Sequence, residues 1–378
     1  MSSMKITKLL SLILLMTFVI QAQDLRQSAL DYLQQLPKPQ NIEAFNPLPH
    51  LPPLNQDTTN ACWSFSTLSF VESEMLRLGR PRVRLAVMYP VYYAFVEKGR
   101  RFVQTKGESR FAPGDLFPGV LETIKKYGIV PMQAYKGQTR SCKTFNHRAL
   151  EKELHTLMQR VKALELWDEE LVTAKIRQIL DKHLGQPPQT FEYRGKEYTP
   201  LSFRDKVVNL PWDDYLMVTS FLYAPFYEFT GLKVPDNWAH NRRYFNVPLD
   251  VFYQSLKEAV QKGYSAAFDS DTGEPGRIGE VDAVFVPPYD IPGRFITPQA
   301  REFRFNNKST TDDHLMHIIG YKQIDGQDWF LVKDSWRSAW LGRFKGYYFF
   351  HGDYIKLKVL AYLVHRDAVP SLTEKMKD

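Results

Sequence analysis

The chain has 378 residues, of which 44% are hydrophobic and 24% are charged, and its formal net charge is +7. These values are ordinary for a globular enzyme, and the length allows more than one hydrophobic core. Two of the positive charges, Lys5 and Lys8, lie in an N-terminal leader, so the rest of the chain carries only +5. A surplus this small and this evenly spread argues against a basic nucleic-acid-binding surface, and we expect no nucleic-acid partner.

The first 22 residues have the pattern of a secretory signal peptide. A short basic segment ends at Lys8, an apolar run extends from Leu9 to Ile20, and the small residue Ala22 follows. The apolar run is shorter than the roughly 20 residues that a membrane-spanning helix needs, so an uncleaved anchor is the weaker alternative. We therefore expect cleavage after Ala22, a secreted or periplasmic location, and no stable membrane association of the mature protein.

The segment from Gln56 to Ser66 places a cysteine at the start of an expected helix. Apolar residues recur at helical spacing after Cys62, and Thr59 or Asn60 could cap the helix. A cysteine at a helix N-terminus is favoured as a thiolate, which is the nucleophilic form. Gln56 could donate a hydrogen bond to a substrate oxygen as negative charge develops there. The alternative is a small buried cysteine that only packs in the core.

The middle of the chain is expected to be mainly helical. Asp115–Gly128 has one apolar face, and Leu150–Leu184 has the pattern of a charged helical hairpin whose second helix begins at Asp168. A charged helical hairpin is usually a solvated cover. A contact between subunits of a homo-oligomer is the functional alternative for this hairpin.

The chain contains only two cysteines, and the second, Cys142, lies in a polar stretch. We interpret Cys142 as a spare thiol. A Cys62–Cys142 disulfide is the alternative, and it would abolish any chemistry that needs a free thiol at Cys62.

The C-terminal third is rich in expected strands and contains the histidine best placed to act as a base. His314 begins an apolar strand, residues 325–328 form a turn, and a second strand leads to Asp334. Two strands joined this way form a hairpin, so His314 and Asp334 can meet across neighbouring strands. We therefore expect His314 to act as general acid and base, Asp334 to orient its ring, and Trp336 to shield their contact from water.

Two alternatives involve His317. It could replace His314 as the base, but the two side chains point to opposite faces of a strand, and only one of them can face Cys62. A metal site built from Asp312, Asp313, His314 and His317 would supply oxygen and nitrogen ligands, but no cysteine pair or His-Glu-x-x-His motif supports it. We expect no metal and no cofactor.

Four stretches of the chain match a known family in order and spacing. They are the nucleophile segment, a helix and strand ahead of the histidine, the start of the histidine strand, and the segment around the aspartate: Gln56–Ser66, Asn246–Asp271, His314–Met316 and Val332–Trp336. On these stretches the chain resembles the papain-like cysteine peptidases, and most closely their bleomycin hydrolase and aminopeptidase C branch.

The resemblance implies an α+β, papain-like fold, in which a helical lobe with the nucleophile faces a β-rich lobe with the histidine, plus a helical insertion. After the signal peptide, the helical lobe, the insertion, the β-rich lobe and a short tail are expected in chain order at residues 23–140, 141–245, 246–370 and 371–378.

The resemblance also implies roles for individual residues. Cys62 would be the nucleophile, His314 the general acid and base, and Gln56 part of the oxyanion hole, and we expect Trp63 and Trp336 to line or shield the cleft. The implied reaction is hydrolysis of peptide bonds through a thioester acyl-enzyme on Cys62, with peptides as substrates and an aminopeptidase mode as in the branch.

The chain departs from the branch in its expected export, in Asn60-Ala61 where glycine and serine usually precede the nucleophile, and at three further points. Asp334 stands where the family usually has asparagine, Arg337 follows Trp336 where glycine is typical, and the tail from Ser371 is shorter than the branch's tail, which enters the cleft and limits cleavage to chain ends. Two alternatives therefore stay open. One is a catalytically silent papain-like binding domain, and the other is a cysteine hydrolase or transferase that acts on non-peptide amides.

Overall fold

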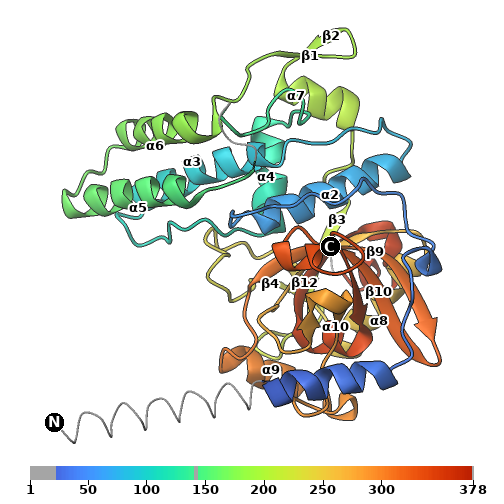
Figure 1. Ribbon diagram of the computed structural model, residues 1–378. Coiled ribbons are helices and arrows are strands. Elements are labelled where there is room, and N and C mark those ends of the chain that lie inside the picture. The colour runs from blue at the N-terminus through green and yellow to red at the C-terminus, as the bar shows by residue number, and fades with distance from the viewer. Residues whose placement is uncertain (1–22, 140–143, 377–378) are drawn as a thin grey trace, which may run out of the picture.

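The computed structural model describes residues 23–139 and 144–376 and arranges them in two lobes (Figure 1). A helical lobe occupies the upper half of the view and a β-rich lobe the lower half. The expected signal peptide, residues 1–22, and Cys142 lie outside the described residues. Within the described ranges, no helix is long and apolar enough to cross a bilayer.

The helical lobe is built around the helix that carries the cysteine, α2 (Cys62–Arg77). Nearly all of its residues up to Met75 are buried, because helices pack on one side of it and the sheet of the other lobe on the other side. The lobe's remaining elements are mostly amphipathic helices and a small hairpin: α3 (Met88–Gln104), α4 (Phe117–Tyr127), α5 (Arg148–Ala163), α6 (Glu169–Leu184), β1 (Phe191–Tyr193), β2 (Lys196–Tyr198) and α7 (Pro200–Phe203).

The helical hairpin expected at Leu150–Leu184 is present as α5 and α6. Asp168 caps α6, accepting a hydrogen bond from the Leu171 N–H at 2.9 Å, as its position before the apolar pattern predicted. Each helix buries four apolar residues, and α6 packs on α3, where Ile176 lies against Gly99. The hairpin therefore covers the core of this lobe, and its role in a homo-oligomer stays a prediction.

The β-rich lobe contains a sheet of ten strands in the order β4-β5-β3-β12-β6-β9-β10-β11-β8-β7 within the described chain. The strands are β3 (Tyr215–Thr219), β4 (Glu228–Thr230), β5 (Tyr244–Asn246), β6 (Ala266–Ser270), β7 (Arg277–Ile278), β8 (Ala283–Val284), β9 (His314–Ile324), β10 (Gln327–Lys333), β11 (Tyr347–His351) and β12 (Val359–His365). Its helices include α8 (Leu249–Gln261), α9 (Pro298–Asn306), α10 (Gly352–Lys358) and α11 (Pro370–Thr373).

Two expected domain boundaries do not follow the observed lobes. The sheet begins before residue 246, since β3, β4 and β5 all precede or reach that boundary and join the sheet through β12. Residues 23–35, which we assigned to the helical lobe, form a helix that packs under the β-rich lobe, where Leu33 contacts the same core as Trp329. Both segments bury apolar side chains against partners distant in sequence, so local patterns did not reveal them.

The expected hairpin around the histidine is confirmed. Strands β9 and β10 pair antiparallel across Asp325 and Gly326, which both adopt positive φ angles, 47° and 78°, as a tight two-residue hairpin turn requires. The register sets Lys333 opposite His317, so the residue after β10, Asp334, emerges beside the start of β9. The hairpin thus carries His314 and Asp334 to the same edge of the sheet.

Candidate active site

A cleft of about 470 Å³ collects the expected site residues from both parts of the chain. The nucleophile segment supplies Gln56, Cys62 and Trp63, and the hairpin segment supplies His314 and Trp336. The other charged residues of its lining are Arg110, Asp115, Asp236, Arg277, Asp312 and Asp313. The fold therefore brings together residues that lie more than 250 positions apart in the sequence.

Cys62 is the first residue of α2, as expected, but neither expected residue caps the helix. Ala61 occupies the N-cap position, and no side chain caps the helix. Asn60 instead donates hydrogen bonds to the Glu151 carboxylate, and the Thr59 hydroxyl donates to the Gln56 carbonyl. The helix N-terminus at Cys62 is consequently left without a competing side-chain oxygen, so its positive end faces the sulfur.

Burial raises the pKa of the Cys62 thiol to about 12, and nearby carboxylates add to the effect. A hydrogen bond from the Leu315 backbone lowers this pKa, while the nearby carboxyl groups, Asp312 first among them, raise it. The cysteine is free and buried. Its conversion to a thiolate therefore needs a neighbouring base or a change in the charge of the carboxylates.

His314 and Asp334 form the contact that the hairpin predicted. The ring Nε2 of His314 lies 2.7 Å from Oδ1 of Asp334, and both side chains are buried. The same oxygen accepts a hydrogen bond from the Trp336 backbone N–H at 2.7 Å, and the Trp336 ring stands edge-on to the imidazole with centroids 6.3 Å apart. With Nε2 occupied, the other ring nitrogen, Nδ1, remains for proton exchange with Cys62 or substrate.

Sequence reasoning missed a further member of this group, Arg277. One of its terminal nitrogens lies 2.6 Å from Oδ2 of Asp334, and both side chains are almost wholly buried. Asp334 therefore has each carboxylate oxygen bound to a different partner. The His314 and Arg277 charges lower the pKa of Asp334 to about 2 despite its burial, so the carboxylate is ionised throughout the working pH range. No local motif marks Arg277, which reaches the site on the short strand β7 at the far edge of the sheet.

Gln56 is buried in the cleft wall and is held in place by two contacts. Its amide oxygen accepts a hydrogen bond from the Ser335 hydroxyl at 2.6 Å, and its amide nitrogen donates to the Thr59 carbonyl at 2.8 Å. Its backbone N–H also donates to the Ser335 carbonyl. These bonds fix the amide group and leave its second N–H for a substrate oxygen.

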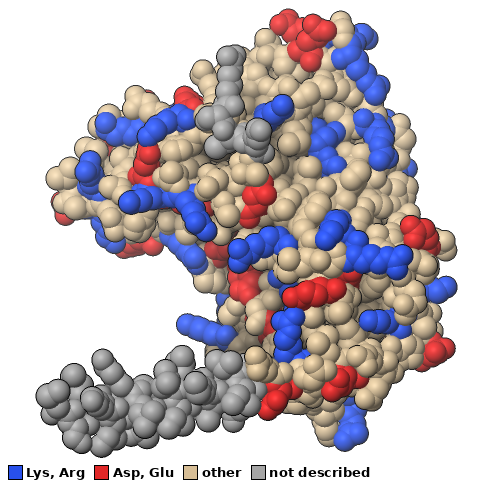
Figure 2. All heavy atoms as spheres, in the orientation of Figure 1, with Lys and Arg blue, Asp and Glu red and all other residues tan. Residues whose placement is uncertain are grey.

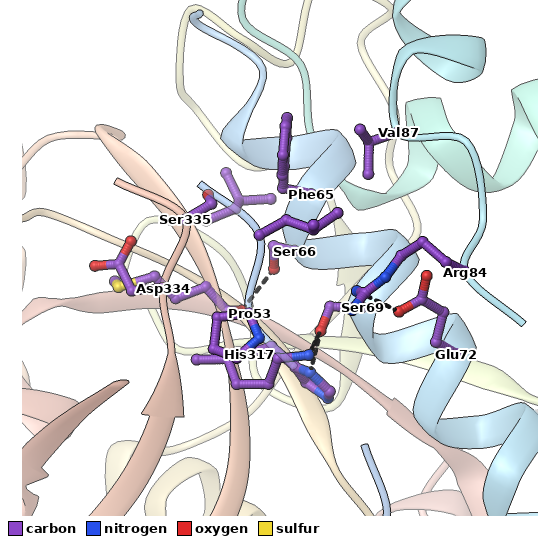
Figure 3. Close-up of a pocket in the computed structure, with 14 residues that line it drawn as sticks. Pro53, Phe65, Ser66, Ser69, Glu72, Arg84, Val87, His317, Asp334 and Ser335 are labelled. Carbon is purple, nitrogen blue, oxygen red and sulfur yellow. Dashed lines mark hydrogen bonds and ion pairs between the residues drawn. The ribbon is translucent and has the colours of Figure 1, made fainter. Parts of the chain in front are cut away.

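His317 lies behind the cleft and contacts α2. Its Nδ1 is 2.9 Å from the Ser69 hydroxyl, which also accepts a hydrogen bond from the Lys333 ammonium at 2.6 Å. Figure 3 shows Ser66, Ser69 and Glu72 of α2 on the side that faces His317, around a cavity of about 30 Å³. Burial holds the pKa of His317 well below its usual range, so it is neutral. His317 thus packs against the second lobe, while His314 faces the cleft.

The metal alternative finds no support in the geometry. His314 and His317 point to opposite sides of β9. Across residues 23–139 and 144–376, no group of three or more histidine, cysteine, aspartate or glutamate side chains is arranged to hold a metal ion. What the site does offer is a thiol, an oriented imidazole and an amide N–H at one cleft, the set of groups required for acyl transfer to sulfur.

Comparison with known protein families gives a match over most of the chain. The model of the Peptidase C1-like family matches residues 110–378, more than half of the sequence, and this part includes His314 and Asp334 but not Cys62. Among curated proteins, the chain is 24% identical to Aminopeptidase C of Listeria monocytogenes, with 81% of each chain covered. It is 25% identical to Aminopeptidase C of Streptococcus thermophilus, over 58% of this chain and 59% of the relative.

A solved structure shares the fold. The crystal structure of PepW from Lactobacillus rhamnosis HN001 covers 88% of this chain, and this chain covers 84% of that structure, with a TM-score of 0.67 and 21% identity. The expected α+β, two-lobe papain-like fold is confirmed.

Proposed function

The chain belongs to the Peptidase C1-like family and is a cysteine peptidase, and from this premise we propose that it acts as an aminopeptidase with Cys62 as its nucleophile. The observation that carries the assignment of the nucleophile is the cleft itself, where Cys62 and Gln56 lie together with a His314 ring that Asp334 holds at 2.7 Å. The resemblance to proteins named Aminopeptidase C supports the aminopeptidase mode.

Cys62, His314 and Gln56 each have a role in the proposed reaction. His314 takes the proton of Cys62, and the sulfur attacks the scissile carbonyl carbon while Gln56 donates a hydrogen bond to the developing oxyanion. His314 then gives the proton to the departing amine, which leaves the acyl group on sulfur as a thioester. Water, deprotonated by His314, hydrolyses the thioester and restores the thiol.

The mixed charge of the drawn face agrees with a peptide substrate. In Figure 2, lysine and arginine are interspersed with aspartate and glutamate. An extended peptide needs mainly a groove with fixed polar groups, as the cleft offers.

Digestion of an unmodified peptide tests the proposal. We expect mass spectrometry to show stepwise loss of single N-terminal residues, and no product when Cys62→Ala replaces the enzyme. Internal cleavage without N-terminal trimming would refute the aminopeptidase mode while keeping the peptidase. Undiminished trimming by Cys62→Ala would refute the assignment of the nucleophile.

We also propose that the enzyme is exported, and the N-terminal leader alone supports this. The basic segment, the apolar run and Ala22 have the order of a cleavable signal peptide. We expect the exported mature protein to begin at Gln23, as read by N-terminal sequencing. A cytoplasmic protein that retains Met1 or its neighbours would contradict this part of the proposal.

A further inference from the structure

One wall of the cleft carries more carboxylates than cations. Asp115, Asp236, Asp312 and Asp313 line it. Asp236 lies 3.6 Å from Arg110, and Asp115 lies 3.9 Å from the buried ammonium of Lys98.

The cations near this wall are already engaged. Arg277 is bound to Asp334, and Lys98 also donates hydrogen bonds to three backbone carbonyls. Among the described residues, Asp312 and Asp313 have no cation within ion-pair distance. The wall therefore holds negative charge that the protein itself does not neutralise.

A buried carboxyl group behind this wall lacks hydrogen-bond donors. Asp269 is 0% exposed, and within residues 23–139 and 144–376, apart from the hydrogen bond between the Asp269 and Asp312 carboxyl groups, no donor reaches either oxygen of Asp269 or Oδ2 of Asp312. Asp269 pairs across the sheet with Leu315, and directly opposed residues point to the same face, so its side chain points to the side where Leu315 lines the cleft. Buried carboxyl groups without other donors are rare in proteins because they are costly. This pair is bound only to itself, so a donor from outside the chain can meet its negative charge.

The Asp269 and Asp312 carboxyl groups form a hydrogen bond with each other, which requires that one of them carries a proton. Burial raises the pKa of Asp269 well above its usual range, which makes Asp269 the protonated partner. Burial, and then the charge of Asp236, raises the pKa of Asp312 to about 7. Above a pH of about 7 the pair thus presents one carboxylate to the cleft through Asp312, close enough to Cys62 to act on its thiol.

The described C-terminal residues do not fill this part of the cleft. Lys375 lies 3.3 Å from the Tyr227 hydroxyl, and Met376 lines a different hollow, next to Trp212 and Arg243. In the part of the tail that the structure describes, no residue lines the cleft around Cys62. Within the described residues, the acidic wall is a feature of this cleft suited to select chain ends.

We propose that Asp312, with Asp269 behind it and Asp236 beside it, forms a subsite for a substrate ammonium group next to Cys62, and that the α-ammonium of the N-terminal residue occupies it. The inference rests on the proposed aminopeptidase function and names its recognition element. An α-nitrogen lies two bonds from its own carbonyl carbon, so an ammonium bound beside the thiol presents the first peptide bond for attack. The side-chain ammonium of a lysine offers the same chemistry from a second source.

Three fluorogenic amides of aminomethylcoumarin separate these sources: alanyl with a free amine, N-acetyl-alanyl, and N-acetyl-lysyl-alanyl. We expect kcat/KM for the free amine to exceed that for N-acetyl-alanyl more than tenfold. Asp312→Asn should reduce the ratio of the free-amine value to the N-acetyl-alanyl value by at least tenfold, and this ratio is independent of any change in the reactivity of Cys62 that affects both substrates alike. Asp213→Asn is the charge-matched control, since this side chain is 93% exposed and lies outside the cleft lining, and we expect it to change neither value.

Equal losses on free and acetylated alanyl substrates in Asp312→Asn would overturn the subsite, because a general disturbance of the site affects both. The enzyme could instead prefer N-acetyl-lysyl-alanyl over the free-amine substrate and lose this preference in Asp312→Asn. That result would keep ammonium recognition by Asp312 but overturn the assignment to the α-ammonium.

A binding measurement keeps the inference testable even if turnover fails. Calorimetry with Cys62→Ala should show tetra-alanine binding more than tenfold more tightly than its N-acetyl form, and Cys62→Ala/Asp312→Asn should lose the difference. Equal affinities in Cys62→Ala would overturn the subsite. A difference without any turnover by the unmodified enzyme would instead refute the proposed function and leave the subsite standing.

Discussion

At the residue scale, the pair formed by Arg277 and Asp334 explains how the site accommodates an aspartate where the family usually has asparagine. A lone carboxylate beside the imidazole would add an unpaired buried charge, which is costly. Arg277 binds the carboxylate oxygen that His314 does not use, at 2.6 Å, and neutralises it. The imidazole is then oriented by a group whose net charge, counted with Arg277, is zero, as it is for asparagine.

This account predicts that Arg277 matters only while residue 334 is charged. Arg277→Gln should lower kcat at least tenfold and destabilise the fold by about 3 kcal/mol, because it leaves a buried carboxylate without its cation. In the Asp334→Asn background the same substitution should cost less than threefold in kcat. Kinetics and thermal unfolding of the two single variants and the double variant measure this. Equal losses from Arg277→Gln in both backgrounds would show that Arg277 has only a packing role.

A second prediction at this scale concerns the reactivity of Cys62. Burial is the main reason for its high pKa, and the charge of Asp312 adds to it. At pH 8 Asp312 is ionised, since its pKa is about 7, so Asp312→Asn removes a real negative charge and should lower the thiol pKa. We expect iodoacetamide to alkylate Cys62 several-fold faster in Asp312→Asn than in the unmodified protein, as followed by intact mass. An unchanged or slower rate would show that the carboxylate does not act on the thiol.

Cys62, Gln56, His314 and Asp334 could be selected from the sequence because each stands in a short local pattern. Arg277 and Asp269 could not, because nothing beside them in the chain distinguishes them from other charged residues. Their importance comes from strand pairing, which sets Asp269 opposite Leu315 and carries Arg277 to the site from 57 residues before Asp334. Roles created by such distant contacts are invisible to a reading of neighbouring residues.

At the scale of elements, the site depends on how α2 lies against the β9–β10 hairpin. The Ser66 hydroxyl donates to the Met316 carbonyl at 2.6 Å, and Ser69 is bound by both His317 and Lys333. These contacts fix the helix that begins at Cys62 relative to the strand that begins at His314. Ser66 and Ser69 are separated by about one helical turn, so both lie on the side of α2 that faces the sheet.

Ser66→Ala tests this link. It removes one hydrogen bond and leaves a buried carbonyl without its donor, so we expect a loss of about 1–2 kcal/mol in the free energy of unfolding. A small shift of α2 should also lower kcat more than it raises KM, because proton transfer between Cys62 and His314 needs close alignment. Chemical denaturation and steady-state kinetics measure both effects. Full activity together with reduced stability would mean that the contact does not align the site.

Among the elements, long amphipathic segments were predictable and short buried ones were not. The stripes of α5 and α6 are long enough to show helical periodicity, and Asp168 marks the start of the second helix. Strands β3 and β5 have five and three residues and are buried throughout, so they show no alternation. Their place in the sheet follows from pairing with β12 and with each other, so the sheet begins before the expected boundary at residue 245.

At the scale of the whole molecule, each of the two lobes supplies part of the candidate site. The helical lobe supplies the thiol, and the β-rich lobe supplies the imidazole, its partners and Asp312 and Asp269. Asp236 comes from the connection between β4 and β5, and Asp115 and Arg110 come from the connection between α3 and α4, so the acidic wall and its neighbouring cation draw on both lobes. The matched family region begins at residue 110, after Cys62, and only the fold joins that cysteine to the rest of the site.

The central claim is that Cys62 is an activated nucleophile in a peptide-binding cleft, and one labelling experiment tests it most directly. The mature, reduced protein is incubated with a peptidyl epoxide and its intact mass is measured, with Cys62→Ala and Cys142→Ser as matched controls for the two cysteines of the chain. We predict one adduct per chain, lost in Cys62→Ala and retained in Cys142→Ser. Folded protein with free thiols that forms no adduct, or forms it on Cys142, would contradict the account and favour a silent binding domain.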